Sequence, residues 1–135
     1  MKGKGFTLIE ILVVLVIVSL MLSVSLPVSY SMYQRYQASQ KAEAVLVWIS
    51  GIRMDSFLYS KERVIDAQGG RLMLDGAEET RASAVTAYMD KPIKFSRNGT
   101  TSGGRIKIGV SDSIFFLDVE APFGGIRLRR SAETG

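Results

Sequence analysis

The first part of the chain is continuously apolar. Residues 11–34 include no charged side chain, and the densest apolar stretch covers residues 11–22. A helix over these roughly 24 residues would be about 36 Å long. Because a bilayer core needs only about 20 apolar residues, the pattern predicts a membrane-spanning helix.

Apolar side chains recur at helical spacing beyond this stretch. The recurring positions, separated by four, three, four and three residues, are Ala38, Ala42, Val45, Ile49 and Ile52. This spacing is typical of one face of an amphipathic helix. We therefore expect one long helix from Thr7 to about Ser60. Residues 6–30 would lie in the membrane, and residues 31–60 would pack their apolar face against the remainder of the chain.

Residues 61–135 show the alternation of β-strands. Residues 63–66 and 71–75 flank a Gly-containing turn at 67–70, which predicts a hairpin. Further strands are expected at 93–97, 105–110, 114–119 and 126–130. Residues 77–89 are ambiguous between a short helix and a loop, and their Ala and Glu content favours the helix. The expected fold class is α+β, with an antiparallel sheet of five or six short strands beside the helix.

The residue types of the chain argue against most enzyme classes. Its 135 residues include neither Cys nor His. The chain therefore has no disulfide framework, no thiolate or imidazole metal site, and no His general base. The adjacent carboxylates Glu78 and Glu79 point apart on a helix or a strand, which makes them a poor acid–base pair. We expect no enzymatic activity, no metal and no cofactor.

Glu10 is the unusual residue of the N-terminal region. It stands just inside the apolar run, where a charge at the centre of a membrane helix costs about 2.5–3.5 kcal/mol. Three interpretations compete: a secretory signal cleaved near Ser25, a simple membrane anchor, and a leader that is processed and leaves a functional carboxylate. Glu10 favours the third, because ordinary signal cores and anchors avoid a carboxylate.

The residues around Glu10 carry a recognisable motif. Residues 5–10 read Gly-Phe-Thr-Leu-Ile-Glu and follow a short basic leader with Lys2 and Lys4. This string resembles the processing motif of type IV prepilins and pseudopilins. The resemblance implies that prepilin peptidase cleaves after Gly5, which removes residues 1–5 as a leader, and that Phe6 is then N-methylated. Loss of two of the 17 basic residues would lower the formal net charge from +4 to +2.

The resemblance also implies how the mature chain would assemble. In a filament, Glu10 of one subunit would pair with the α-amino group of Phe6 in its neighbour. Partners would be other pilins or pseudopilins, the prepilin peptidase and an inner-membrane assembly platform. Pro27 would act as a helix hinge when subunits leave the bilayer, although a simple kink at the membrane edge explains it equally well.

The basic leader predicts the orientation in the membrane. Positively charged residues stay on the cytoplasmic side, so Lys2 and Lys4 place the N-terminus there. The chain would cross the inner membrane once, with the C-terminal domain in the periplasm, and would later join a periplasmic filament.

The C-terminal part suggests which member of the family this is. A Gly-rich turn at Ser102-Gly103-Gly104 precedes one predicted strand, and a final strand lies at 126–130. This order is similar to the minor pseudopilin family GspH/FimT, which implies a subunit of a type II secretion pseudopilus. The alternative is a minor type IV pilus subunit for motility, adhesion or DNA uptake. An alternative of another class is a soluble periplasmic binding domain exported by the Sec pathway.

Weaker signals have ordinary explanations. Arg127, Arg129 and Arg130 could bind nucleic acid, but a charged edge strand is the simpler interpretation, because no aromatic residue is interleaved with them. We therefore expect no nucleic acid partner. Residues 98–100 match a glycosylation sequon and are better explained as a turn.

The acidic residues near the C-terminus are candidates for a calcium site. Asp112, Asp118 and Glu120 lack the spacing of a calcium-binding loop. The sequence therefore gives no support to a metal site there.

Overall fold

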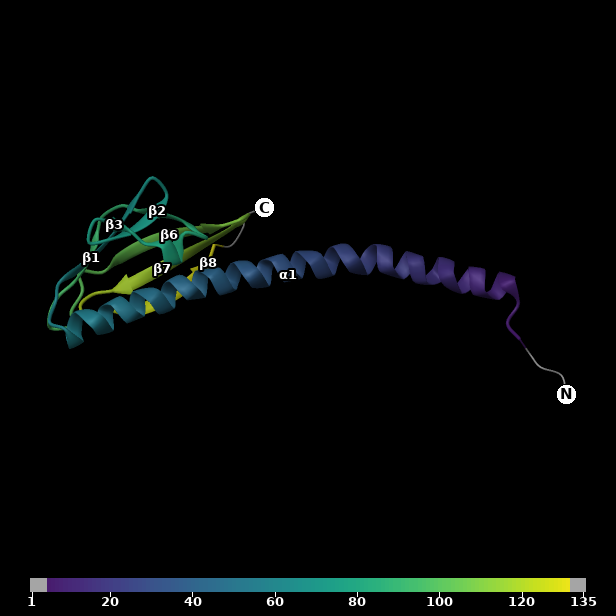
Figure 1. Ribbon diagram of the computed structural model, residues 1–135, viewed down its shortest axis with the longest axis horizontal. Coiled ribbons are helices and arrows are strands. Elements are labelled where there is room, and N and C mark those ends of the chain that lie inside the picture. The colour runs from purple at the N-terminus through teal and green to yellow at the C-terminus, as the bar shows by residue number, and fades with distance from the viewer. Residues whose placement is uncertain (1–4, 132–135) are drawn as a thin grey trace. The chain divides into compact units, whose positions relative to one another are not determined.

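The computed structural model describes residues 5–131 (Figure 1). Helix α1 (Leu8–Leu58) comes first, and eight strands and one 3₁₀ helix follow it. The chain divides into two compact units between Tyr36 and Gln37. The expected α+β class is confirmed, and the helix begins and ends within two residues of the expected positions.

The part of α1 that lies in the first unit has no buried residue. Its large apolar side chains, from Leu8 to Tyr36, are 44% to 82% exposed. Several of its serine hydroxyls bond back to helix carbonyls: Ser19 donates to Leu15 at 2.7 Å, Ser23 to Leu20 at 2.8 Å and Ser31 to Val28 at 2.9 Å. The segment therefore presents an apolar surface with few free polar groups.

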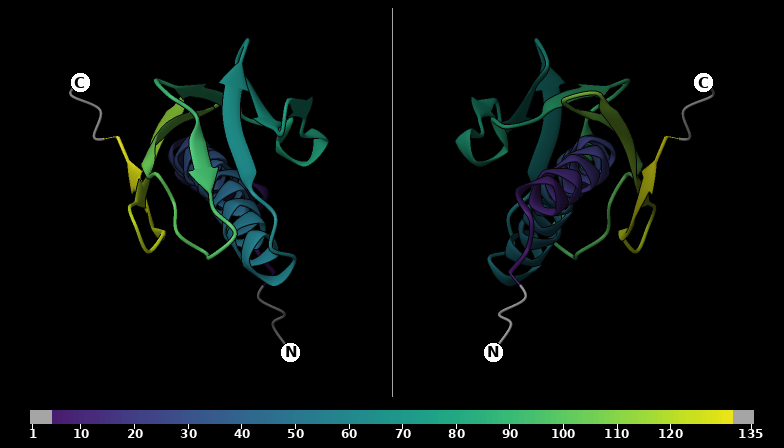
Figure 2. Two further views of the ribbon diagram at one scale, coloured as in Figure 1. Left: turned by 90° about the vertical axis from the view of Figure 1, so that its left-hand side faces the viewer. Right: turned by 90° about the vertical axis from the view of Figure 1, so that its right-hand side faces the viewer.

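The part of α1 in the second unit has one buried face. The predicted residues Ala38, Ala42, Val45, Ile49 and Ile52 are all at most 5% exposed, which confirms the amphipathic pattern. They form one hydrophobic cluster with the inward side chains of the strands. Figure 2 shows these strands beside the blue-to-teal part of the helix.

The strands form two antiparallel sheets rather than the single sheet expected. The first sheet has the order β3-β2-β1-β5, and the second has the order β4-β6-β7-β8. The strands are β1 (Arg63–Gln68), β2 (Arg71–Leu74), β3 (Ala77–Glu78), β4 (Thr86–Met89), β5 (Ile93–Phe95), β6 (Gly104–Val110), β7 (Ser113–Glu120) and β8 (Gly125–Arg130). The predicted hairpin at β1–β2 is confirmed. Its turn is only Gly69-Gly70, both with positive φ, as a two-residue type I′ turn requires.

The prediction that favoured a helix over residues 77–89 is wrong. The segment contains β3, a three-residue 3₁₀ helix (Thr80–Ala82) and β4. Asp75 and Gly76 have positive φ and turn the chain back, so that Ala77 pairs with Leu74. In β4, Ala87 pairs with Ile108 and is fully buried. Tertiary strand pairing therefore outweighs the weak helix propensity of this segment.

A close approach of two backbones explains one glycine. Gly103 has φ +69°, and a Cβ there would lie 2.9 Å from the Val119 carbonyl oxygen. Gly69 also has positive φ (+59°), but a Cβ there would meet nothing within 4 Å. Gly69 is therefore needed only for its positive φ. Gly103 is needed for its positive φ and also because a side chain would not fit.

We predict that Gly103→Ala destabilises the second unit more than Gly69→Ala does. Gly69→Ala should cost only the left-handed backbone penalty, about 1–2 kcal/mol. Gly103→Ala should cost about 1–3 kcal/mol more, because the backbone must shift. Urea unfolding of the full chain in non-ionic detergent, followed by the fluorescence of the single tryptophan, Trp48, measures both. Equal costs would contradict the close approach.

Candidate processing and assembly site

The predicted cleavage site lies just before α1. Gly5 and Phe6 lie outside any helix or strand and are exposed, and Phe6 is 85% exposed. A Cβ added at Gly5 would meet nothing within 4 Å, so the fold of the described chain does not require glycine there. A requirement for Gly5 would therefore come from a protease that must approach the backbone closely.

Thr7 and Glu10 cap the N-terminus of the helix. The Glu10 amide donates to Thr7 Oγ1, and the Thr7 amide donates to Glu10 Oε2, each at 3.3 Å. This reciprocal pair is a capping box, which satisfies two amides that the first helical turn leaves free. The Thr-x-x-Glu spacing in the sequence is the local signal for this cap.

The capping box also fixes where the Glu10 carboxylate lies. It bends back to the Thr7 amide, one residue from the Phe6 nitrogen. Cleavage after Gly5 would turn that nitrogen into a charged amine. The carboxylate is therefore held at the end of the helix where the new positive charge would form.

Pro27 lies inside α1 and does not end it. The neighbouring side chains of Leu26 and Val28 are 62% and 56% exposed, as elsewhere in this unit. The hinge role of Pro27 stays a prediction.

Comparison with known proteins identifies the family. Residues 1–26 match the family model of the prokaryotic N-terminal methylation motif. The chain is 35% identical over 91 residues to the competence protein ComGC of Streptococcus pneumoniae, in both the serotype 4 strain TIGR4 and strain R6. Each alignment covers 67% of this chain and 81% of the relative. The chain belongs to the type IV pilin-like family. No solved structure matches the chain significantly.

Membership of the pilin-like family explains the exposed first unit. Helix α1 is the one helix within residues 5–131 that is long and apolar enough to cross a membrane. A pilin-like protein is anchored in the membrane by this segment and carries its second unit outside the bilayer. Lys2 and Lys4, on which the orientation was predicted, lie outside the described residues.

Two of the acidic candidates for a metal site, Asp118 and Glu120, are paired with arginines. Asp118 binds Arg105 and Arg129, and Glu120 forms an ion pair with Arg127 at 3.2 Å. Within the described range, 5–131, no three acidic, His or Cys residues come together as a metal site would require.

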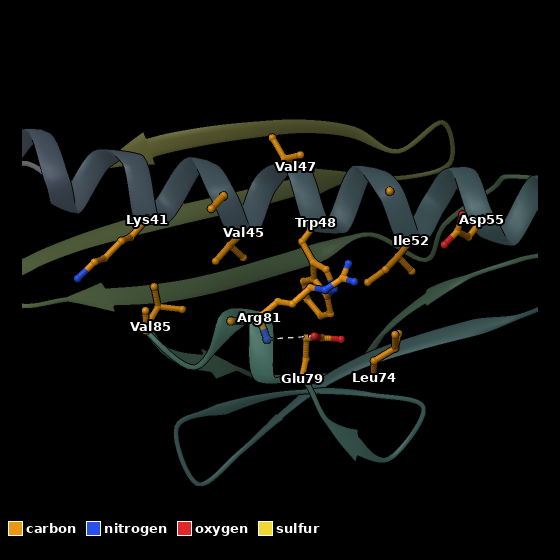
Figure 3. Close-up of a pocket in the computed structure, with 14 residues that line it drawn as sticks. Lys41, Val45, Val47, Trp48, Ile52, Asp55, Leu74, Glu79, Arg81 and Val85 are labelled. Atoms are coloured by element: carbon orange, nitrogen blue, oxygen red, sulfur yellow. Dashed lines mark hydrogen bonds between the residues drawn. The ribbon is translucent and has the colours of Figure 1, made fainter.

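The remaining acidic and sequon residues have structural roles. Glu78 binds Arg71 at 2.9 Å, and Glu79 accepts a hydrogen bond from the Arg81 amide at 3.1 Å (Figure 3). Glu79 thereby caps the 3₁₀ helix beside a cavity of about 670 Å³ that Trp48 also lines. Asn98 Oδ1 accepts a hydrogen bond from the Thr100 amide at 3.1 Å, so the sequon forms a turn.

The C-terminal arginines lie on the edge strand β8. Arg127 and Arg129 pair with carboxylates on β7, and Arg130 donates to the Ser113 hydroxyl at 3.0 Å. A charged edge strand is the arrangement that the sequence predicted. Strand register places Lys107 of β6 and Phe116 of β7 on the face that carries Arg127 and Arg129. No local pattern in the sequence indicates this arrangement.

Asp118 holds the centre of this charged face. The hydrogen bond from Arg105, at 2.6 Å, lowers the pKa of Asp118, and the bond from Arg129 lowers it further, although partial burial opposes both. A carboxyl group with a lowered pKa in the folded state adds stability above its unfolded pKa. That stability is lost as the pH falls through the lower, folded pKa.

We predict that Asp118→Asn lowers the thermal midpoint of the second unit at pH 7. The loss in the free energy of unfolding should be at most about 1 kcal/mol, because the arginine partners are solvent-exposed. The difference from the parent chain should shrink as the pH falls below the unfolded aspartate pKa of about 3.9 and through the lower pKa of folded Asp118. Thermal unfolding of the full chain in non-ionic detergent across this range measures it. A difference that does not change with pH would contradict the role of the two ion pairs.

Proposed function

We propose that this pilin-like protein is a structural, non-catalytic subunit of a type IV pilus-like filament, matured by prepilin peptidase. The observation that carries the proposal is the exposed apolar part of α1, with Glu10 in a capping box at its N-terminus. Such a surface needs either lipid or the helices of other subunits to cover it. A filament subunit uses both in turn.

In the membrane stage, the apolar part of α1 spans the bilayer. About 20 residues after Leu8 reach across a core of about 30 Å. Tyr30, Tyr33 and Tyr36 follow and are 58% to 65% exposed. Tyrosines gather where a membrane helix leaves the hydrocarbon, so these three mark the outer interface. The basic leader then places the N-terminus in the cytoplasm and the second unit beyond the inner membrane.

In the assembly stage, cleavage supplies Glu10 with a better partner. The capping box gives the Glu10 carboxylate one neutral donor, the Thr7 amide, through a hydrogen bond of 3.3 Å. A hydrogen bond between two charged groups is roughly twice as strong as a neutral one. In an apolar filament core, a lone carboxylate and a lone amine are each costly, and together they satisfy each other. Glu10 therefore exchanges its cap for the methylated amine of Phe6 in the neighbouring subunit.

The filament that fits the relatives is one that serves competence. Two competence proteins are 35% identical to this chain over 81% of their own length. DNA uptake is therefore the favoured role of the filament. A type II secretion pseudopilus is the second candidate, supported by the turn at Gly103, which leads into β6 as in the GspH/FimT pattern. A Sec-exported soluble domain would leave Glu10 and the Gly5-Phe6 junction without a role.

We predict that Glu10→Val is processed normally but fails to enter filaments, because no carboxylate remains for the Phe6 amine. Glu10→Gln should assemble poorly, since it keeps hydrogen-bonding capacity without the charge. Immunoblots of sheared filaments and of membranes from the native host measure assembly and processing separately. The control is Glu43→Gln, an exposed carboxylate in the amphipathic part of α1.

The same strains distinguish the two filaments. Loss of transformation with normal secretion supports the competence filament, and loss of secreted enzymes supports the secretion pseudopilus. Normal assembly of Glu10→Val would contradict the pairing with Phe6.

A further inference from the structure

A groove runs along the amphipathic part of α1 within the second unit. One wall is α1 from Lys41 to Asp55, and the facing wall is formed by residues between Leu74 and Val85. The helical rise between Lys41 and Asp55 gives it a length of about 21 Å. Its volume of about 670 Å³ is within the range of small-molecule binding sites. We call it the Trp48 groove, after the residue at its middle.

Trp48 has open space beside it. The indole is half-buried and points from α1 towards the segment that carries Glu79 and Arg81 (Figure 3). Ala44 and Gly51, about one helical turn before and after Trp48, are both small. A Cβ at Gly51 would meet nothing within 4 Å, so packing within the described chain does not require a glycine that weakens the helix. The space that Gly51 leaves open is available to a bound molecule.

The charged side chains of the groove have no ionic partners. Lys41 and Arg81 are positive, Asp55 and Glu79 are negative, and none of the four forms an ion pair with another described residue. Lys41, Asp55 and Arg81 are exposed. Glu79 Oε1 accepts one hydrogen bond, from the Arg81 amide at 3.1 Å. Charged groups of both signs can therefore bind a further molecule.

The backbone of the walls offers little to a peptide. The amides of α1 along the groove are bonded within the helix. On the facing wall, the amide of Glu79 donates to the Leu72 carbonyl at 3.0 Å, and the amides of Ala82 and Val85 donate to the carbonyls three residues earlier at 3.3 Å. An extended peptide needs backbone partners along its length, and these walls would leave its amides unpaired.

The mixture of charges argues against three other occupants. An anion would meet the carboxylates of Asp55 and Glu79, and a cation would meet Lys41 and Arg81. An apolar helix would bury all four charges without partners, which is costly. Residues 11–33 of a second copy are such a helix, because they include no charged side chain.

A neutral molecule with many hydroxyl groups fits both signs of charge. Each hydroxyl can donate to a carboxylate and can accept from an ammonium or a guanidinium group. Sugar rings combine such hydroxyls with an apolar C–H face, and the negative face of an indole ring attracts the slightly positive hydrogens of that face. The groove supplies both kinds of contact.

We propose that the Trp48 groove binds a neutral saccharide chain. One sugar ring would stack on Trp48 in the space beside Gly51, while the two carboxylates and the two cations bind hydroxyls. An extended tetrasaccharide is about as long as the distance from Lys41 to Asp55, so its ends would reach both residues. The site goes beyond the proposed function and does not depend on processing or filament assembly. Either proposal can therefore fail without the other.

The test follows the fluorescence of Trp48, the single tryptophan of the chain. The full chain is titrated with cellotetraose, maltotetraose and tetra-N-acetylchitotetraose in a polyoxyethylene detergent, which carries no sugar headgroup. At least one of these neutral probes should change the emission saturably. Because the probes are uncharged, the affinity should change little between low and high salt.

Gly51→Leu blocks the groove without removing any of its side chains. It should weaken binding at least about tenfold, because the new side chain occupies the space beside the indole. The thermal midpoint should stay the same or rise, since leucine favours a helix more than glycine does. Ser50→Leu is the matched control: it adds the same side chain at an exposed position that does not line the groove, and it should bind like the parent chain.

Asp55→Asn tests the polar contacts. It should weaken binding about fivefold, because a hydrogen bond from a hydroxyl to a charged acceptor is stronger than one to a neutral amide. Glu43→Gln is its control, since Glu43 is an exposed carboxylate of α1 that does not line the groove. Circular dichroism checks that every variant folds.

Four results would overturn the proposal. The first is no saturable change with any of the three neutral probes. The second is unchanged binding in Gly51→Leu, which would place the sugar elsewhere. The third is tighter binding of tetragalacturonate than of the neutral chains, which would indicate an anion site. The fourth is self-association that alters the emission of Trp48 and is lost in Gly51→Leu, which would show that a second copy covers the groove.

Discussion

The apolar surface of the first part of α1 is the constraint on which the rest of the molecule depends. About twenty large apolar side chains are exposed between Leu8 and Tyr36, and their burial would contribute on the order of tens of kcal/mol. A single carboxylate at the centre of a membrane helix costs about 3 kcal/mol. Burial therefore outweighs Glu10 by a wide margin, and the segment enters an apolar environment despite its charge. In the proposed filament, Glu10 would then favour the arrangement in which its carboxylate meets the Phe6 amine of a neighbouring subunit.

The same helix serves two surroundings because its composition changes along its length. Between Ile11 and Tyr33 it has no charged residue and exposes apolar side chains, so lipid or neighbouring helices suit it equally. After Gln37 only one face is buried, and it begins with the small residues Ala38 and Ala42. Later positions on that face are larger, including Ile49 and Ile52, and pack with the two sheets. The second unit can thus stay folded while the first unit exchanges lipid for protein.

The helix and its buried face could be predicted because they depend on local periodicity. The strands β6, β7 and β8 were also predictable, since each alternates clearly between apolar and polar residues. Residues 77–89 were not, because β3 and β4 are short and gain their stability from partners such as Leu74 and Ile108. The division into two sheets likewise depends on pairing between distant strands, which no local pattern encodes.

The candidate site divides in the same way. The motif from Gly5 to Glu10 is continuous in sequence and could be recognised there, although its capping geometry came from the structure. The face around Lys107 and Phe116 could not be predicted, because strand register assembles it from four separate segments. The residues next to Arg127 and Arg129 in the sequence include no aromatic ring. The ring beside Arg129 in the sheet, Phe116, belongs to another strand.

The proposed function depends on cleavage between Gly5 and Phe6, which removes the leader and leaves the apolar helix intact. Intact mass and N-terminal sequencing of the protein from native membranes, with and without prepilin peptidase, test it most directly. We expect a chain that begins at N-methylated Phe6 when the peptidase is present and at Met1 when it is absent. A chain that begins near Leu26, or one that still begins at Met1 when the peptidase is present, would contradict it.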